Sequence, residues 1–410
     1  MSTDGKALMS QSTHRDRLLE DASFHIEFHG YLSNHAKHAV IALRGLGASE
    51  EDITAYVTDY AANTYGFGLE PARPSAVTLS EASWRELLGK HEEFEALRRF
   101  FQGRVRTLGL EETLRRYVPD LIPGLVGALL HGAIHLGWAL DAGHEGMIVE
   151  GLAYLSFSFV SCDPRLTHGG SALENSDRTP LESLRRIATQ WSQSKVGLSG
   201  WVDETLELPE LSIAAGFQPT LEHTGAQLSI ARVLARGHEL IESTPKWAQA
   251  PVTEETWREL YYAIAVVYMS EPGDFALLHL ITALHAVESI ARHLPPAGQQ
   301  AAIEYYWKSA LGILFALKAV PTPAQLTALH ARFASSSDPA PDASIQAEWE
   351  DIVQRARQER EEHNPKLVYV TRMLWGRFGR ASIHRECARH FTTTPVLSPS
   401  AEFAPSRQGN

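Results

Sequence analysis

The amino-acid sequence predicts an all-α protein, a single large domain whose helices pack around a central buried pocket rich in histidine. Three observations support this prediction. Apolar residues recur at three- and four-residue spacing through most of the chain. Segments that alternate apolar and polar residues are almost absent. Histidine is frequent, with 19 copies in 410 residues, and several copies lie inside apolar segments.

The helices are expected where the apolar spacing is clearest, and capping residues support two of the helix starts. Thr78 and Ser80 stand before Glu81, and Thr253 stands before Glu254 in the same way. The clearest segments are residues 87–110, 181–191, 221–241, 254–269, 275–294, 301–318 and 348–363.

The domain boundaries follow from composition. No change in composition divides the chain, so residues 15–391 are expected to form one helical domain. Residues 1–14 are polar and residues 392–410 are rich in Ser, Pro and Thr, and both ends are predicted to be disordered. Two distant cysteines and an N-terminus without a secretory signal predict a cytoplasmic protein.

Charge and hydropathy exclude two classes of partner. The net charge of -12, without a block of Lys and Arg, argues against binding to nucleic acid. Residues 121–140 are nearly all apolar and long enough to span a bilayer. They also contain Pro123, four glycines and two histidines, and no second such segment exists. We therefore expect a buried helix in this segment rather than a membrane span.

Several catalytic motifs are missing from the sequence. It contains no glycine-rich dinucleotide fingerprint, no phosphate-binding P-loop and no His-Glu-x-x-His zinc motif. A nucleotide cofactor would therefore need another mode of binding, and a metal site would have to be built mainly from imidazoles.

His131 and His135 form the strongest candidate pair. Four residues apart on a predicted helix, they lie on one face, one turn apart. Two imidazoles at this spacing can bind one metal ion, and neutral imidazole suits iron, zinc and copper. Gly132 and Gly137 would let a second helix or a flat substrate approach closely. The alternative is that both histidines are core residues with ordinary hydrogen bonds.

Three further histidines are candidates for the same site. His35 and His38 stand at the start of an apolar helix, with Asn34 as a capping or supporting residue. His279 is a single polar residue within an apolar helix, whereas His285, six positions later, points to a different face. Each of the three has a structural alternative, a buried histidine with its hydrogen bonds satisfied.

Lys308 lies beside Trp307 and ahead of a strongly apolar stretch. The structural interpretation is that its stem covers apolar surface while the amine stays in water. The chemical interpretation is that burial lowers the pKa of the amine. A neutral amine can add carbon dioxide and become a carbamate, which is an anionic oxygen ligand.

Four segments, taken together and in order, resemble the questin oxidase family. They are NHAKHAVIALRGLGAS at 34–49, HGAIHLGWAL at 131–140, HLITA at 279–283 and EHNPKL at 362–367. The most specific parts are Asn-His-x-x-His ahead of Leu-Gly-Ala-Ser, and His-x-x-x-His followed by Leu-Gly. The resemblance spans roughly residues 16–372.

The resemblance implies an oxygen-dependent oxidoreductase that opens a ring of a hydroxylated anthraquinone or similar polycycle. Questin oxidase is described as acting in Baeyer–Villiger fashion with NADPH. A related ring-cleaving member is described as a non-haem iron enzyme, its ion held by four histidines and a carboxylated lysine.

Carried onto this chain, the resemblance implies a specific set of site residues. The iron ligands would come from His131, His135, His279 and one or both of His35 and His38. Lys308 would be the carbamate position, and His363 and Lys366 would be supporting residues of the pocket. Lys308, His363 and Lys366 are thereby the candidates for a part in catalysis.

The expected mechanism needs an aromatic pocket and a balanced charge. The aromatic residues that would stack on a flat phenolic substrate are Trp138, Tyr65, Phe67 and Trp307. An anion, either the carbamate or a carboxylate such as Glu27, would offset the charge of a ferrous ion in a dry site.

Three other functions stay open at this point. A hydrolase would use the same histidines with zinc. A metal-free monooxygenase would use NADPH. A helical binding protein without catalytic activity would have structural histidines only.

Overall fold

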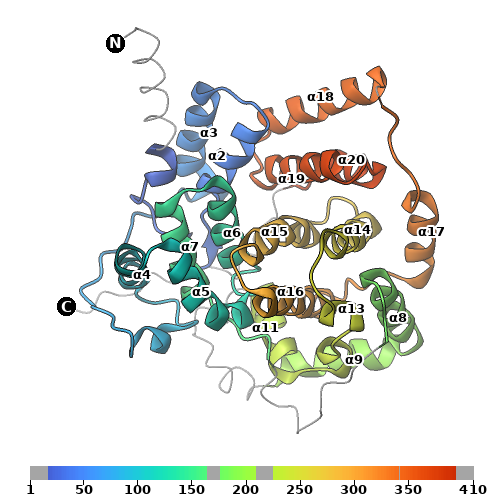
Figure 1. Ribbon diagram of the computed structural model, residues 1–410, viewed down its shortest axis with the longest axis horizontal. Helices are drawn as coiled ribbons and strands as arrows, with labels where there is room; N and C mark the ends of the chain where they lie inside the picture. Colours follow the sequence, from blue (N-terminus) through green and yellow to red (C-terminus); the bar gives the residue numbers. More distant parts are fainter. Residues whose placement is uncertain (1–16, 164–175, 209–224, 341, 394–410) are drawn as a thin grey trace.

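The computed structural model describes residues 17–163, 176–208, 225–340 and 342–393. Helices dominate these residues, and the only strands among them form one short hairpin, which confirms the predicted all-α fold (Figure 1). The expected disorder of residues 1–14 lies outside the described residues, as does that of the tail from 394. Thr392, expected to begin the disordered tail, is buried and hydrogen-bonded to Asn364, with 2.9 Å between its backbone nitrogen and Oδ1.

The helices up to residue 207 are α2 (Ala36–Gly45), α3 (Glu50–Asn63), α4 (Phe94–Leu108), α5 (Leu110–Leu121), α6 (His131–Ala142), α7 (Glu145–Phe157), α8 (Pro180–Gln193) and α9 (Lys195–Glu207). The later helices are α11 (Ala226–Arg236), α12 (Glu239–Glu242), α13 (Lys246–Gln249), α14 (Glu254–Ser270), α15 (Phe275–Ala291), α16 (Pro296–Ala316), α17 (Pro323–Phe333), α18 (Ala343–Gln358), α19 (His363–Arg377) and α20 (Ser382–Arg389). Short 3-10 turns are η1 (Thr64–Gly66), η2 (Trp84–Leu87) and η3 (Ile122–Gly124).

A small antiparallel hairpin precedes the first of these helices. β1 (Glu27–Phe28) pairs with β2 (Leu32–Ser33), so that Glu27 lies opposite Ser33. The chain then enters α2 at His35, the N-terminal cap residue of that helix.

Side-chain caps begin several helices where the sequence supplies a short polar residue. Thr253 accepts a hydrogen bond from the backbone of Thr256 in a reciprocal capping box, which confirms the predicted start of α14. Thr322 and Gln325 form a second capping box at α17. These caps satisfy backbone N–H groups that the first turn of a helix leaves unpaired.

The predicted buried helix over residues 121–140 is only partly present. Its second half is α6, but Ala128, Leu129 and Leu130 all have φ between 49° and 71°, the left-handed region. Three such residues in succession cannot continue a right-handed helix. The chain therefore turns sharply and begins α6 at His131.

Helices α6, α7 and α15 form the centre of the molecule (Figure 1). Glycine permits the close approach of their backbones: a Cβ on Gly137 would lie 2.2 Å from the backbone oxygen of Ala286 in α15. A Cβ on Gly132 would lie 2.8 Å from Cα of Leu155 in α7. The two glycines thus allow neighbouring helices to approach closely, which is one of the two roles predicted for them.

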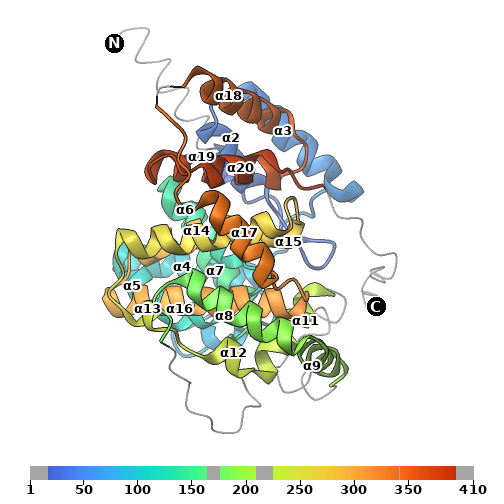
Figure 2. The same cartoon turned by 90° about the vertical axis from the view of Figure 1, so that its right-hand side faces the viewer.

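The N- and C-terminal helices of the described chain lie side by side. In both views α2 and α3 pack beside α18 and α19, next to the central helices (Figures 1 and 2). This arrangement brings residues near position 35 to residues near position 363. No helix among the described residues has the length and apolar character needed to cross a membrane.

Candidate metal centre

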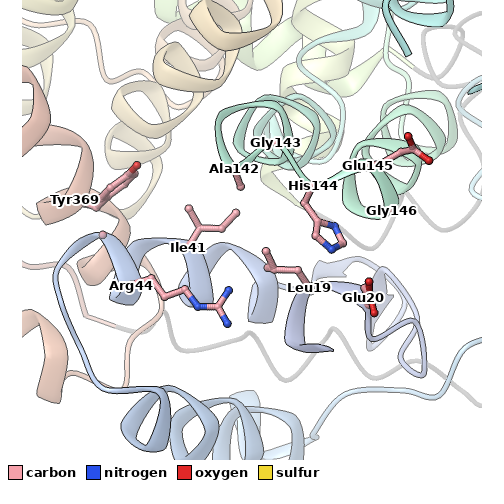
Figure 3. A pocket seen from close by; sticks show the side chains of 11 residues that line it. Leu19, Glu20, Ile41, Arg44, Ala142, Gly143, His144, Glu145, Gly146 and Tyr369 are labelled. Carbon is pink, nitrogen blue, oxygen red and sulfur yellow. The ribbon is translucent and has the colours of Figure 1, made fainter. Parts of the chain in front are cut away.

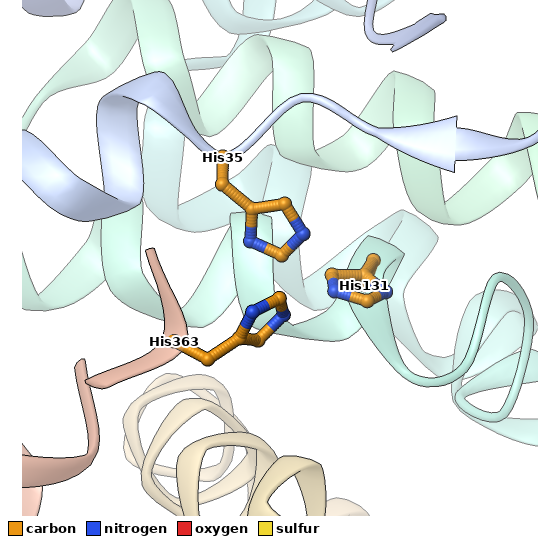
Figure 4. A group of neighbouring side chains, drawn as sticks. All are labelled: His35, His131 and His363. Atoms are coloured by element: carbon orange, nitrogen blue, oxygen red, sulfur yellow. The ribbon is translucent and has the colours of Figure 1, made fainter. Parts of the chain in front are cut away.

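Four histidines from four separate elements meet beside the central helices. They are His35 at the cap of α2, His131 at the start of α6, His279 in α15 and His363 at the start of α19. His35, His131 and His363 each offer a ring nitrogen within 4.8 Å of the other two, and Figure 4 shows these rings turned toward one another. His279 completes the group, with its ring centroid 4.8 Å from that of His131 and 4.7 Å from that of His363.

The left-handed turn before α6 sets the position of His131. Because the chain reverses at residues 128–130, the carbonyl of Ala128 comes within 2.5 Å of Nδ1 of His131. Left-handed conformations of residues other than glycine cost roughly 1–2 kcal/mol each. Such strain persists where the surrounding structure enforces it, and it is concentrated at functional sites.

The rings of His131 and His279 face each other, and their hydrogen bonds to backbone carbonyls leave both Nε2 atoms unsatisfied. Nδ1 of His131 contacts the carbonyl of Ala128, and Nδ1 of His279 contacts that of Phe275 at 2.7 Å. A carbonyl oxygen can only accept a hydrogen bond, so in both rings the hydrogen is on Nδ1. In a neutral ring, Nε2 then carries a lone pair and no hydrogen. These two Nε2 atoms lie 3.2 Å apart. A cation between them would satisfy both.

Polar groups behind the other two rings orient them toward the same point. Nδ1 of His363 lies 2.5 Å from a carboxylate oxygen of Glu361, and its buried Nε2 has no hydrogen-bond partner among the described residues. Nδ1 of His35 lies 2.6 Å from the amine of Lys366. A carboxylate behind a metal-binding imidazole fixes its tautomer and raises its basicity.

Burial keeps the imidazoles of the group neutral. Desolvation, together with the charge of Lys366, lowers the pKa of His35 and of His363 well below the ordinary value, and it lowers the pKa of His279 to about 3. The pKa of His131 is lowered in the same way, by burial and then by His279. Neutral rings at physiological pH are the form that binds metal.

A buried lysine and a buried acid accompany the histidines. Lys366 is fully buried, and desolvation lowers the pKa of its amine below the ordinary range. Glu362 is also buried, and desolvation with the charge of Glu361 raises its pKa. Glu361, Glu362 and His363 together form a second cluster of potential ligand atoms directly beside the first.

His38 and His135, both predicted as ligands, form a neighbouring pair instead of joining the central group. Nε2 of His38 lies 3.1 Å from Nδ1 of His135, and Nε2 of His135 lies 3.4 Å from the carboxylate of Glu150. Glu150 in turn binds the amine of Lys37 at 2.6 Å. His38 remains close to the central group, with its ring centroid 5.5 Å from that of His35.

The structure does not bring Lys308 to the histidines. Its amine forms ion pairs with three carboxylates at 3.5 to 3.7 Å: Glu242, Asp163 and Glu304. Burial alone would lower the pKa of Lys308, but these three carboxylates outweigh it and raise the pKa. A protonated amine does not add carbon dioxide. This corrects the expectation of a carbamate at Lys308, and the lysine that contacts the histidine group is Lys366.

The aromatic and acidic residues predicted for the pocket lie at different places. Trp307 packs on Trp247, with 5.2 Å between ring centroids, in the region of Lys308. Phe67 is 53% exposed and stacks on His29. Tyr65 packs near Phe28. Trp138 is buried, 6.1 Å from the ring of His38.

Glu27 is bound away from the central group. Its two carboxylate oxygens contact the hydroxyl of Tyr154 at 3.0 Å and Nδ1 of His91 at 3.2 Å. The aromatic ring that packs directly on the histidine group was not predicted. It is Phe275, with its centroid 4.9 Å from that of His279 and 4.7 Å from that of His363.

Sequence reasoning also missed the two acids before His363. Glu361 and Glu362 directly precede His363, a predicted pocket residue, but they stand at the end of the predicted helix 348–363, where acidic residues are common. Two carboxylates adjacent to a buried histidine were the available signal.

The donor set fits a metal ion. Four neutral imidazoles in a buried pocket suit a divalent first-row metal such as iron or zinc. The facing lone pairs of His131 and His279 and the unpaired Nε2 of His363 are the atoms that such an ion would need.

Comparison with known proteins places the chain in a family context. A family model described as questin oxidase-like matches residues 32–371 and confirms the resemblance seen in the sequence. The chain is also similar to a Baeyer-Villiger monooxygenase, AacuH, of Aspergillus aculeatus. The two are 25% identical over 128 residues, which cover 29% of this chain and 27% of that relative. The chain therefore matches about a quarter of the length of this relative.

Proposed function

Because the chain belongs to the questin oxidase-like family, we propose that it is an oxygen-dependent oxidoreductase with a non-haem iron(II) centre. The proposed substrate is a polycyclic phenol of the anthraquinone type, and the proposed reaction opens one of its rings by oxygen insertion or dioxygen cleavage. The observation that supports the metal centre best is the pair of bare Nε2 atoms of His131 and His279, 3.2 Å apart.

The four ligands in this proposal are His35, His131, His279 and His363. They replace the set inferred from the sequence, in which His38 and His135 stood where His363 now stands. These four imidazoles would hold the iron(II) ion, and the ion would supply the chemistry that activates dioxygen.

We assign the carbamate implied by the family resemblance to Lys366. Its amine is buried, its pKa is lowered by desolvation, and it lies 2.6 Å from His35. Addition of carbon dioxide to the neutral amine forms an N–C bond and releases one proton. The resulting anion would offset part of the charge that four neutral ligands leave uncompensated in a dry site.

The protein's own residues would perform three further tasks. Glu361 holds the ring of His363 through Nδ1. Phe275 covers one side of the histidine group and excludes water from it. Nδ1 of His38, which is buried and has no hydrogen-bond partner among the described residues, would offer a hydrogen-bonding group beside the site.

The first prediction concerns the metal. Protein purified without oxygen is expected to contain iron, measured by elemental analysis, and His131→Ala is expected to lose it with little change in helicity by circular dichroism. The control is His384→Ala, which removes a buried histidine of α20 outside this group. Iron content in the His131 variant equal to that of the control would refute the proposed site.

The reaction is tested by oxygen uptake with a hydroxylated anthraquinone as the probe. Uptake that depends on iron supports the oxygenase. Zinc in place of iron, with turnover that consumes no oxygen, would identify a hydrolase that uses the same histidines.

A further inference from the structure

The proposed function raises the question of where electrons enter the protein. A monooxygenase takes two electrons from a donor for each dioxygen, since one oxygen atom enters the product and the other leaves as water. The sequence offers no dinucleotide-binding motif. The inference below rests on the proposed function and concerns a second site.

A pocket opens at the surface at the far end of α6 from the histidines. Its volume is about 680 Å³, within the range of roughly 300–1,000 Å³ that is usual for small-molecule sites. Figure 3 shows its lining, which comes from residues 19 and 20, from α2, from the connection between α6 and α7, and from Tyr369 of α19. Leu19, Ile41 and Ala142 supply apolar walls, and Arg44 and Glu20 supply polar ones. A small aromatic ring that carries hydroxyl groups suits this mixture.

One face of α6 connects the pocket with the metal centre. His131, His135, Trp138 and Ala142 follow one another at spacings of four, three and four residues, so they share that face. His131 belongs to the metal centre and Ala142 lines the pocket. At 1.5 Å per residue the two ends are about 16 Å apart.

Conjugated rings fill this distance. The centroid of His38 lies 5.5 Å from that of His35, Trp138 follows at 6.1 Å, and Tyr369 follows Trp138 at 5.6 Å. Trp138 is fully buried, whereas Tyr369 reaches the pocket. Tryptophan and tyrosine are the side chains most readily oxidised by one electron, so this row of rings is suited to passing electrons singly.

Tyr369 also has a proton acceptor. Its hydroxyl donates to the carboxylate of Asp141 at 3.1 Å, and Nε2 of His285 lies 3.2 Å from the same carboxylate oxygen. A phenol that loses an electron becomes strongly acidic, so a carboxylate within hydrogen-bond distance can take its proton in the same step.

We propose that this pocket binds a small hydroquinone and that Tyr369 and Trp138 pass its electrons, one at a time, to the metal centre. In each transfer an electron leaves Tyr369 by way of Trp138, and the phenol proton moves to Asp141. The hydroquinone then reduces the tyrosyl radical, the proton on Asp141 returns to the phenol oxygen, and a proton of the hydroquinone leaves to solvent. Two rounds turn the hydroquinone into a quinone and supply the two electrons.

The proposed electron path can take electrons from a hydroquinone but not from NADPH. NADPH gives up two electrons together as a hydride, which must pass directly to an acceptor in contact with the nicotinamide. A row of separated rings accepts single electrons only. NADPH is therefore not the donor expected at this pocket.

The pocket is tested in metal-free protein with 2-methyl-1,4-naphthoquinone as the probe. Illumination of the bound quinone in frozen solution should draw an electron from Tyr369 and give a semiquinone and a tyrosyl radical by electron paramagnetic resonance. Tyr369→Phe should abolish the tyrosyl signal, and Ala142→Trp should weaken quinone binding by about tenfold or more.

The matched control is Tyr305→Phe. Tyr305 also donates to a carboxylate, that of Asp163, but lies on α16 outside the pocket. It should keep the full radical signal. A signal unchanged in Tyr369→Phe, or quinone binding unchanged in Ala142→Trp, would overturn the proposal.

The connection to the metal is tested in oxidised, iron-loaded protein mixed anaerobically with tetramethylhydroquinone. Trp138→Phe should slow the loss of the ferric signal by about tenfold or more at unchanged iron content. Equal rates in the variant and the wild type would overturn the electron path. If the protein holds no iron, the proposed function fails, while the test with metal-free protein still decides whether the pocket binds a quinone beside Tyr369.

Discussion

At the scale of single residues, the orientation of three of the four imidazoles is set by a group behind the ring. The carbonyls of Ala128 and Phe275 and the carboxylate of Glu361 contact Nδ1 atoms and so direct the Nε2 atoms inward. The site is therefore organised before any ion arrives, and the groups behind the rings should matter nearly as much as the rings.

A change at Glu361 tests this organisation. Glu361→Gln should weaken metal binding by about 10–100-fold, because the amide is a poorer partner for Nδ1 of His363 than a carboxylate. Affinity is measured by competition with a chelator of known strength. The half-buried neighbour Glu359→Gln is the control and should bind as tightly as the wild type.

Lys366 gives a second prediction at this scale. If its amine carries carbon dioxide, ¹³C-labelled bicarbonate should give a carbamate resonance in the nuclear magnetic resonance spectrum of the protein. Lys366→Ala should lose that resonance, whereas Lys308→Ala should keep it, because the amine of Lys308 is held protonated by three carboxylates. A signal that follows Lys308 would reverse the assignment.

How far the site could be predicted differs between its residues. His131 and His279 were identifiable because a histidine in an apolar helix is conspicuous in sequence. The choice among the remaining histidines, and between Lys308 and Lys366, depends on which elements lie side by side. That information resides in the contact between α2 and α19, which no local pattern encodes.

At the scale of elements, the longest helices followed their apolar periodicity and their caps. The predicted segments 254–269 and 275–294 closely match α14 and α15. The segment 121–140 did not form one helix, although Ala128, Leu129 and Leu130 favour helical structure intrinsically. Tertiary packing overrides that preference here, since a Cβ on the preceding Gly127 would lie 1.8 Å from the carbonyl oxygen of Ser158.

The contact of α6 with α15 depends on the lack of a side chain at Gly137. Gly137→Ala should destabilise the protein by about 1–3 kcal/mol, because the new Cβ would meet the backbone of Ala286 at 2.2 Å and the helices would have to move apart. Gly103→Ala in α4 has open space around it and should stabilise the protein by up to about 1 kcal/mol. Denaturation in urea measures both, and similar effects at the two positions would contradict the packing described.

At the scale of the whole molecule, the neutral histidines link folding to pH. The pKa of each ring in the group is lowered on folding from an ordinary value of 6.5, to about 3 for His279. Below pH 6.5 the unfolded chain binds protons at these histidines and the folded protein does not. The free energy of unfolding therefore falls as the pH falls.

Metal-free protein should show this dependence directly. Each pH unit below 6.5 should cost about 1.4 kcal/mol for every histidine that remains neutral, until the pH reaches the lowered pKa. The melting temperature, measured between pH 7.5 and 5, should decline for the wild type and decline less for His279→Gln. A flat profile would show that the rings are not held neutral.

The distribution of the ligands along the chain has a consequence for how the protein matures. His35 leaves the ribosome early and His363 late, and their elements touch only when α19 packs against α2. A nascent chain therefore cannot bring the four histidines together until α19 has been made and has packed against α2. Under the proposed function, uptake of the metal would then report that α2 and α19 have met, so that an immature molecule is also an inactive one.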